Sequence, residues 1–107
     1  MKKTIERIVA FAAKIAEPEE IILFGSMTNG SHDVYSDIDL LIVTEDDIGK
    51  RQIAEQIQRF ARDLSLRADI LIHSKSKVEE ASMQPNSFLA GIVANGITVY
   101  QKYKKSA

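Results

Sequence analysis

The sequence predicts an α/β fold: a small mixed β-sheet of three to four strands flanked by helices, in the order α-β-α-β-α-β. Two patterns predict this class. Stretches with apolar residues at three- and four-residue spacing alternate with short, continuous apolar runs. The chain has 107 residues, 45% of them hydrophobic, which suits one compact domain with a buried core. We therefore expect a single domain over residues 1–107.

The first half of the chain predicts one helix followed by two strands. Pro18 ends the helix, whose apolar stripe is Ile5, Ile8, Val9, Ala12, Ile15 and Ala16. Residues 21–24 form a short apolar run closed by Gly25, which is typical of a buried strand. Residues 26–36 are polar and indicate a loop that has room for one helical turn. Residues 38–43 are apolar and branched, so we expect a strand buried on both faces.

A long helix and a third strand follow. Asp46 or Asp47 is the expected N-cap of the helix. Its apolar stripe is Ile48, Ile53, Ile57, Phe60, Ala61 and Leu64. Residues 68–72 are predicted to form the third strand.

The last part of the chain predicts two short helices and a fourth strand. Ser76 followed by Glu79 fits a capping box that opens the first of these helices. Residues 85–95 predict the second helix, with Gly96 as a left-handed C-terminal stop. Residues 97–100 are expected to form the closing strand.

Composition excludes several classes of protein. The formal net charge is −1, from 14 basic and 15 acidic side chains, which argues against a broad basic face for direct nucleic-acid binding. The chain has no apolar run of the ~20 residues that cross a bilayer, and its N-terminus does not resemble a signal peptide. With no cysteines, a disulfide framework and a thiolate zinc site are excluded. We expect a cytoplasmic protein that does not associate with membranes.

Gly25 and Ser26 form the first candidate site, at the end of the first predicted strand. Glycine lets a phosphate approach the backbone closely, and the amides of a following helical turn point towards an anion. The serine adds a hydroxyl donor. Taken alone, a glycine–serine pair after a strand is more often an ordinary turn.

Asp37 and Asp39 form the second candidate site, at the start of the second predicted strand. Side chains two residues apart in a strand share a face, so the two carboxylates repel each other. A hard divalent cation relieves this repulsion, and Mg²⁺ favours carboxylates together with phosphate oxygens. The alternative is a pair of solvated aspartates at a strand end. Ser36 is a further candidate for a bound phosphate, or a plain loop serine.

Asp69 also begins an apolar run, in the third predicted strand. If the second and third strands are neighbours, Asp69 joins Asp37 and Asp39 around one or two metal ions. Two such ions activate an attacking oxygen and stabilise the leaving one. The alternative roles for Asp69 are an ion pair with Arg67 or a plain surface position.

Together these residues resemble a known family. Phe24-Gly25-Ser26, ten further residues and Asp37-Ile38-Asp39-Leu40 are similar to the signature of the DNA polymerase β-type nucleotidyltransferase superfamily. The likeness is greatest to its minimal nucleotidyltransferases (MNT), relatives of the kanamycin nucleotidyltransferases. It covers nearly the whole chain, including Asp69 and the segment from Ser87 to Tyr100.

The resemblance implies a fold, ligands and residue roles. It implies the nucleotidyltransferase fold, two Mg²⁺ ions and ATP or another nucleoside triphosphate. Gly25, Ser26 and Ser36 would bind the nucleotide, and Asp37 and Asp39 would bind both metal ions. Asp69 would bind the catalytic metal ion and help to deprotonate the acceptor. One departure is Asn29, because many members have an arginine immediately before the corresponding glycine.

The resemblance also implies a partner. Larger relatives bind the acceptor with a second domain, for which these 107 residues leave no room. MNT antitoxins pair with helical HEPN-domain toxins and transfer AMP from ATP to a toxin tyrosine, so we expect such an enzyme in a hetero-oligomer. One alternative is a non-catalytic antitoxin that sterically blocks its partner. A weaker one is transfer to a small molecule such as an aminoglycoside.

Overall fold

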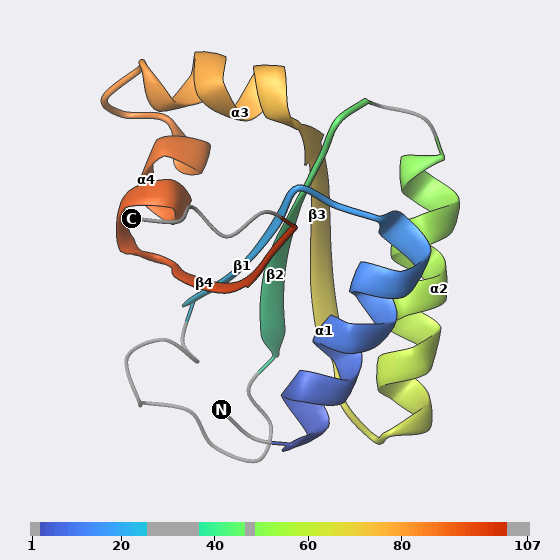
Figure 1. Ribbon diagram of the computed structural model, residues 1–107. Helices are drawn as coiled ribbons and strands as arrows, with labels where there is room; N and C mark the ends of the chain where they lie inside the picture. The colour runs from blue at the N-terminus through green and yellow to red at the C-terminus, as the bar shows by residue number, and fades with distance from the viewer. Residues whose placement is uncertain (1–2, 26–36, 47–48, 103–107) are drawn as a thin grey trace.

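The structure, a computed structural model, describes residues 3–25, 37–46 and 49–102. These residues form an α/β sandwich around a four-stranded sheet (Figure 1). Within them, none of the helices has the length and apolar character needed to cross a membrane. The elements in chain order are α1 (Lys3–Ala16), β1 (Glu20–Phe24), β2 (Ile38–Thr44), α2 (Lys50–Asp63), β3 (Ala68–Ser74), α3 (Lys75–Ser82), α4 (Phe88–Asn95) and β4 (Ile97–Gln101).

The sheet is mixed, as the sequence predicts, with the strand order β3-β2-β1-β4. Strand β1 pairs antiparallel with β2 on one side and with β4 on the other. Strands β2 and β3 are parallel, and α2 provides the connection between them. The α/β class and the mixed sheet are therefore confirmed. The second and third predicted strands are also neighbours, which is the condition for Asp69 to lie beside the other carboxylates.

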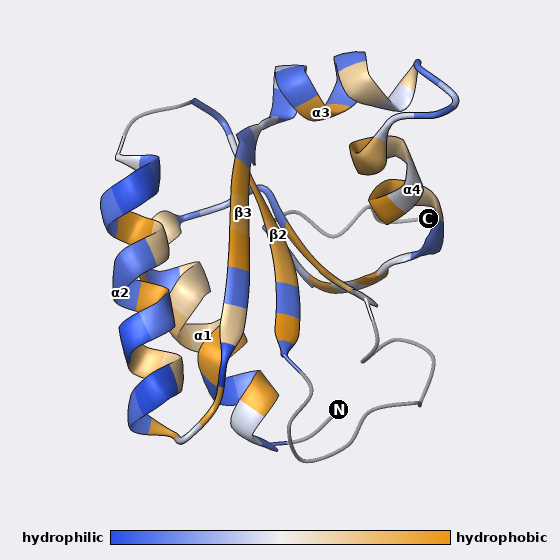
Figure 2. Cartoon of the chain, turned by 180° about the vertical axis from the view of Figure 1, so that it is seen from behind, coloured by the Kyte–Doolittle hydropathy of each residue, from blue (hydrophilic) through white to orange (hydrophobic). Residues whose placement is uncertain are grey.

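Two hydrophobic cores lie on opposite faces of the sheet. Helices α1 and α2 cover one face, where the Phe11 and Phe60 rings stack with centroids 4.3 Å apart. Helices α3 and α4 cover part of the other face through Val78 and Ile92. Figure 2 shows apolar residues concentrated along β2 and β3, whereas α2 turns many hydrophilic residues outward. The sheet is thus buried on both faces, and β2 lies inside it.

Strand β2 is almost wholly buried, which confirms the prediction from its apolar run. Only Asp39 is partly accessible within it. Because side chains alternate along a strand, Asp39 lies on the same face as Leu41, which belongs to the core beneath α3 and α4. Asp39 therefore lies at the end of that face where the helical cover stops.

Two predicted helix caps are wrong. Helix α2 is preceded by Gly49 in a left-handed conformation (φ 71°), not by a capping Asp46; Asp47 lies outside the described residues. The backbone oxygen of Asp46 instead accepts a hydrogen bond from the Thr44 hydroxyl at 2.6 Å. Helix α3 is capped by Ser74, whose hydroxyl accepts from the Lys77 amide. Strand β3 runs on to Ser74, so Ser76 falls inside the helix.

The last helix also differs from the prediction. It begins after Ser87, whose hydroxyl accepts a hydrogen bond from the Ala90 amide at 3.0 Å. Gly96 is extended (φ −76°) rather than left-handed, because the chain passes directly into β4. A Cβ on Gly96 would overlap Ile22 and would lie 2.6 Å from the carbonyl oxygen of Ile92. Gly96 is therefore needed for close packing rather than for its backbone angle.

Candidate functional site

Two predicted carboxylates lie side by side at the start of β2 and β3. Asp39 and Asp69 are register partners in the parallel pair and so share one face of the sheet. Asp39 is half-buried and Asp69 is exposed. Leu71, two residues beyond Asp69, packs against the core under α3 and α4. The pair thus lies just outside that core, at a position accessible to a ligand.

Burial and the neighbouring carboxylates disfavour the charged form of Asp39. The pKa of Asp39 is raised from 3.8 to about 6, first by burial and then by the charge of Asp69. A hydrogen bond between the Asp39 and Asp69 carboxyls and the charge of Asp37 raise it further. A cation bound between the carboxylates would offset their repulsion.

We expect Asp39→Asn to stabilise the ligand-free protein at pH 7.5. The pKa of Asp39 is higher in the folded protein than its ordinary value of 3.8, so the native state binds more protons between pH 3.8 and about 6. The free energy of unfolding therefore falls as pH rises through this window and stays lowered above it. After allowance for solvent screening of this partly exposed group, Asp39→Asn should raise the free energy of unfolding by about 1 kcal/mol at pH 7.5. Little should be recovered at pH 4.

Thermal unfolding at the two pH values measures this effect. A gain of about 1 kcal/mol raises the midpoint by roughly 4–8 °C in a domain of this size. Glu80→Gln, which neutralises an exposed carboxylate on α3, is the matched control. An equal gain for Asp39→Asn at pH 4 and pH 7.5 would contradict the electrostatic explanation.

Gly25 packs directly against the Asp39 carboxylate. It follows β1 with φ +82°, a left-handed conformation that L side chains rarely adopt. A Cβ at this position would overlap Oδ2 of Asp39 and would lie 3.1 Å from its Cγ. The Gly25 backbone thus approaches the Asp39 carboxylate more closely than any residue with a Cβ could, and the predicted contact of Gly25 with a phosphate stays a prediction.

The predicted site residues are only partly brought together. Asp37 lies immediately before β2 and contributes least to the raised pKa of Asp39. Ser26, Ser36 and Asn29 lie outside the described residues. Within the ranges that the structure covers, no three His, Cys, Asp or Glu side chains form a group that could hold a metal ion. Mg²⁺ is usually held by one or two carboxylates plus substrate phosphates, so the Asp39–Asp69 pair fits it.

A pocket of about 380 Å³ adjoins the carboxylates on the side of α2. Asp37 and Asp69 line it together with Arg62, Arg67 and Gln58. From the sequence, Arg67 is expected only as an ion-pair partner of Asp69, and no local pattern points to Arg62 or Gln58. Arg62 lies in the last turn of α2 and Arg67 just before β3, so only the folded connection between them brings both to the pocket.

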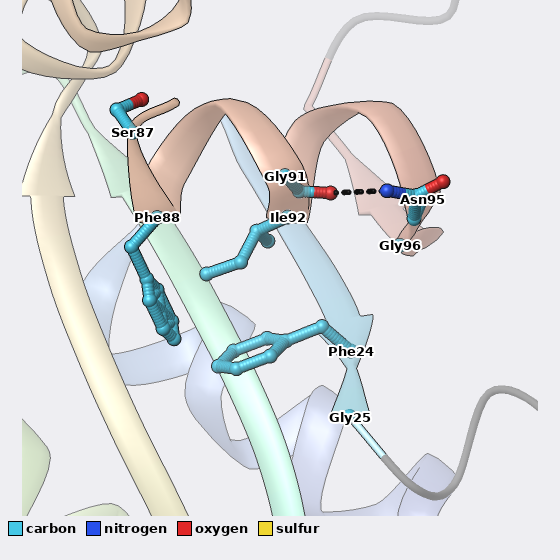
Figure 3. A pocket seen from close by; sticks show the side chains of 8 residues that line it. All are labelled: Phe24, Gly25, Ser87, Phe88, Gly91, Ile92, Asn95 and Gly96. Carbon is cyan, nitrogen blue, oxygen red and sulfur yellow. Dashed lines mark hydrogen bonds between the residues drawn. The ribbon is translucent and has the colours of Figure 1, made fainter. Parts of the chain in front are cut away.

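A second pocket, of about 310 Å³, lies between α4 and the end of β1, and Gly25 forms part of its lining. Figure 3 shows the Phe88 ring directed towards the Phe24 ring; the centroids are 6.0 Å apart and the planes nearly perpendicular. Gly91 and Asn95 of α4 form another part of its wall. No local sequence pattern connects α4 with β1, so this pocket could not be predicted from the sequence.

The family model of the nucleotidyltransferase domain matches residues 2–95 of this chain. The chain belongs to this nucleotidyltransferase family. The resemblance found in the Gly-Ser and Asp-x-Asp motifs is thereby confirmed, as is the general class of activity, transfer of a nucleotidyl group. No curated protein matches the chain significantly.

Solved structures share the nucleotidyltransferase fold. A candidate nucleotidyltransferase from Sulfolobus solfataricus matches with a TM-score of 0.60 and 19% identity, over 94% of this chain and 79% of that one. A chain from a toxin–antitoxin complex with AMP-PNP matches with a TM-score of 0.58 and 20% identity, over 90% and 73% of the two chains. At these identities the similarity establishes the fold.

Proposed function

We propose that this nucleotidyltransferase domain uses Mg²⁺ to transfer AMP from ATP to a protein hydroxyl, as the antitoxin of a toxin–antitoxin pair. The acceptor in this proposal is a tyrosine of a helical HEPN-domain toxin. The observation that carries it is the Asp39–Asp69 pair, in register beside Gly25, within a chain of this family.

The donor nucleotide is proposed to lie at Gly25. Glycine lets a phosphate approach the backbone closely, and Ser26 and Ser36 are proposed as further ligands. Asp37, Asp39 and Asp69 would hold two Mg²⁺ ions. The bound ions would stabilise negative charge on the α-phosphate and on the departing pyrophosphate. The raised pKa of Asp39 supports this role, because crowded carboxylates are common at functional sites.

The acceptor is proposed to approach from the pocket lined by Asp69, Arg62 and Arg67. Asp69 is exposed there and can accept the proton of a tyrosine hydroxyl. The tyrosine oxygen then forms a bond to the α-phosphorus as the bond to pyrophosphate breaks. The products are an AMP-tyrosine and pyrophosphate. The two arginines offer positive charge to acidic groups near the acceptor.

A toxin partner is supported by the fold shared with the toxin–antitoxin chain that was solved with AMP-PNP. Two large apolar side chains near α4, Met83 and Ile97, are also exposed, as in a surface that another protein covers. We therefore propose a hetero-oligomer. Because ATP is the donor, the reaction is expected in the cytoplasm.

Two measurements test the proposal together. Calorimetric titration should detect ATP binding that requires Mg²⁺ and is lost in Asp37→Asn/Asp39→Asn. Incubation of a HEPN-domain partner with the protein and MgATP should then increase the partner's mass by one adenylyl group. If neither the protein nor its complex with the partner binds MgATP, and the partner's mass stays unchanged, the catalytic proposal is wrong.

A further inference from the structure

We propose that the pocket between α4 and the end of β1 is the subsite for the aromatic base of the donor nucleotide. This inference rests on the proposed function, because it assigns the part of the donor that the carboxylates do not contact. The pocket is lined by Phe24, Gly25, Ser87, Phe88, Gly91, Ile92, Asn95 and Gly96.

The pocket lies next to the proposed phosphate site. Gly25 belongs both to its wall and to the contact with the Asp39 carboxylate. The pocket therefore starts where the proposed phosphate site ends. A nucleotide whose phosphates lie beside Asp39 needs space for its base within a few ångströms of Gly25, and about 310 Å³ is available there.

The lining of the pocket offers an accessible aromatic ring. Phe88 is 62% exposed although it is a large apolar residue, and Phe24 supports it edge-on at 6.0 Å. This arrangement holds the Phe88 ring in place and leaves it accessible at the pocket. A flat heteroaromatic ring can stack on such a ring, and every base offers a π-face for stacking.

Gly91 leaves open space in the wall of the pocket. It lies inside α4, where alanine is the more favourable residue, yet a Cβ added there would meet no atom within 4 Å. The space beside Gly91 is therefore open, and a larger side chain can enter it without disturbing the backbone. Asn95 borders the same wall and donates a hydrogen bond from Nδ2 to the Gly91 carbonyl at 3.1 Å (Figure 3).

The experiment compares ATP with inorganic tripolyphosphate, which carries the phosphates without the base. Both are titrated calorimetrically, with Mg²⁺, into the full chain and its variants. The wild type should bind ATP about tenfold more tightly than tripolyphosphate. Phe88→Ala removes the stacking surface and Gly91→Leu fills the pocket, so each should weaken ATP binding about tenfold and leave tripolyphosphate binding unchanged.

Val93→Ala is the control, because Val93 is a partly exposed residue of α4 outside the pocket lining. Circular dichroism confirms that each variant is folded, and Gly91→Leu also replaces a poor helix former with a good one. Unchanged ATP affinity in both folded variants overturns the base subsite, and so does an equal loss for ATP and tripolyphosphate. If Phe88→Ala weakens only toxin binding, the ring belongs to the partner interface and the inference is wrong.

Failure of this inference is distinct from failure of the proposed function. If the wild type binds ATP and tripolyphosphate equally in the presence of Mg²⁺, the phosphate site stands and the base subsite does not. If it binds neither ligand, with or without its toxin partner, the proposed function fails and the base subsite fails with it.

Discussion

Asp39→Asn and Asp69→Asn are each expected to reduce nucleotide transfer by at least about 10³-fold. Both carboxylates are proposed to hold Mg²⁺, and Asp69 is also the proposed proton acceptor. Asparagine keeps the size of the side chain but loses the charge that attracts the metal ion. The measurement is the rate at which the toxin gains an adenylyl group, followed by mass spectrometry at saturating MgATP.

Asp63→Asn is the matched control, because it neutralises an exposed aspartate at the end of α2, outside the pockets beside Asp39. It should retain full activity. The same variants separate the enzyme from an antitoxin that only blocks its partner. If Asp39→Asn still neutralises the toxin without modifying it, steric blocking explains the antitoxin effect and transfer does not.

Gly25→Ala is expected to destabilise the protein by roughly 2–3 kcal/mol and to abolish MgATP binding. Two costs add at this position. The backbone has φ +82°, which alanine adopts with strain, and the new Cβ would overlap the Asp39 carboxylate. Relief of the overlap would move that carboxylate away from the proposed phosphate site. Chemical denaturation measures the first effect and calorimetric titration the second.

Gly49→Ala isolates the backbone cost. Gly49 also has a positive φ, of 71°, but a Cβ there would lie 3.9 Å from its nearest neighbour, in ordinary contact. Its loss of stability should therefore be about 1 kcal/mol. In an Asp39→Ala background the cost of Gly25→Ala should fall towards that value. An unchanged cost in this background would show that the overlap with Asp39 contributes nothing.

Local patterns were sufficient for most of the fold. The continuous apolar run of residues 38–43 predicted a strand buried on both faces, and β2 is buried in this way. The apolar stripes of residues 5–16 and 48–64 predicted the two long helices that cover one face of the sheet, and Ile48 itself lies outside the described residues. These predictions succeed because a helix that buries one face repeats apolar residues at three- and four-residue spacing, whereas a strand buried on both faces is continuously apolar.

Short-range reasoning failed at the helix termini. The caps at Ser74 and Gly49 depend on where β3 ends and how the chain turns into α2, not on the best capping residue nearby. Gly96 likewise reflects its contact with Ile22. A terminus is decided by the neighbouring element, and several adjacent polar residues are locally almost equivalent as caps.

The candidate site divides in the same way. Gly25, Asp37, Asp39 and Asp69 are predicted as site residues from the sequence, because the residue types and their positions at strand ends indicate phosphate and metal chemistry, and their roles stay predictions. The parallel register that joins Asp39 to Asp69, and the contact of Gly25 with Asp39, depend on how separate strands pair. The arginine-lined and phenylalanine-lined pockets likewise exist only once distant elements pack together, since no local pattern encodes contacts between residues far apart in the chain.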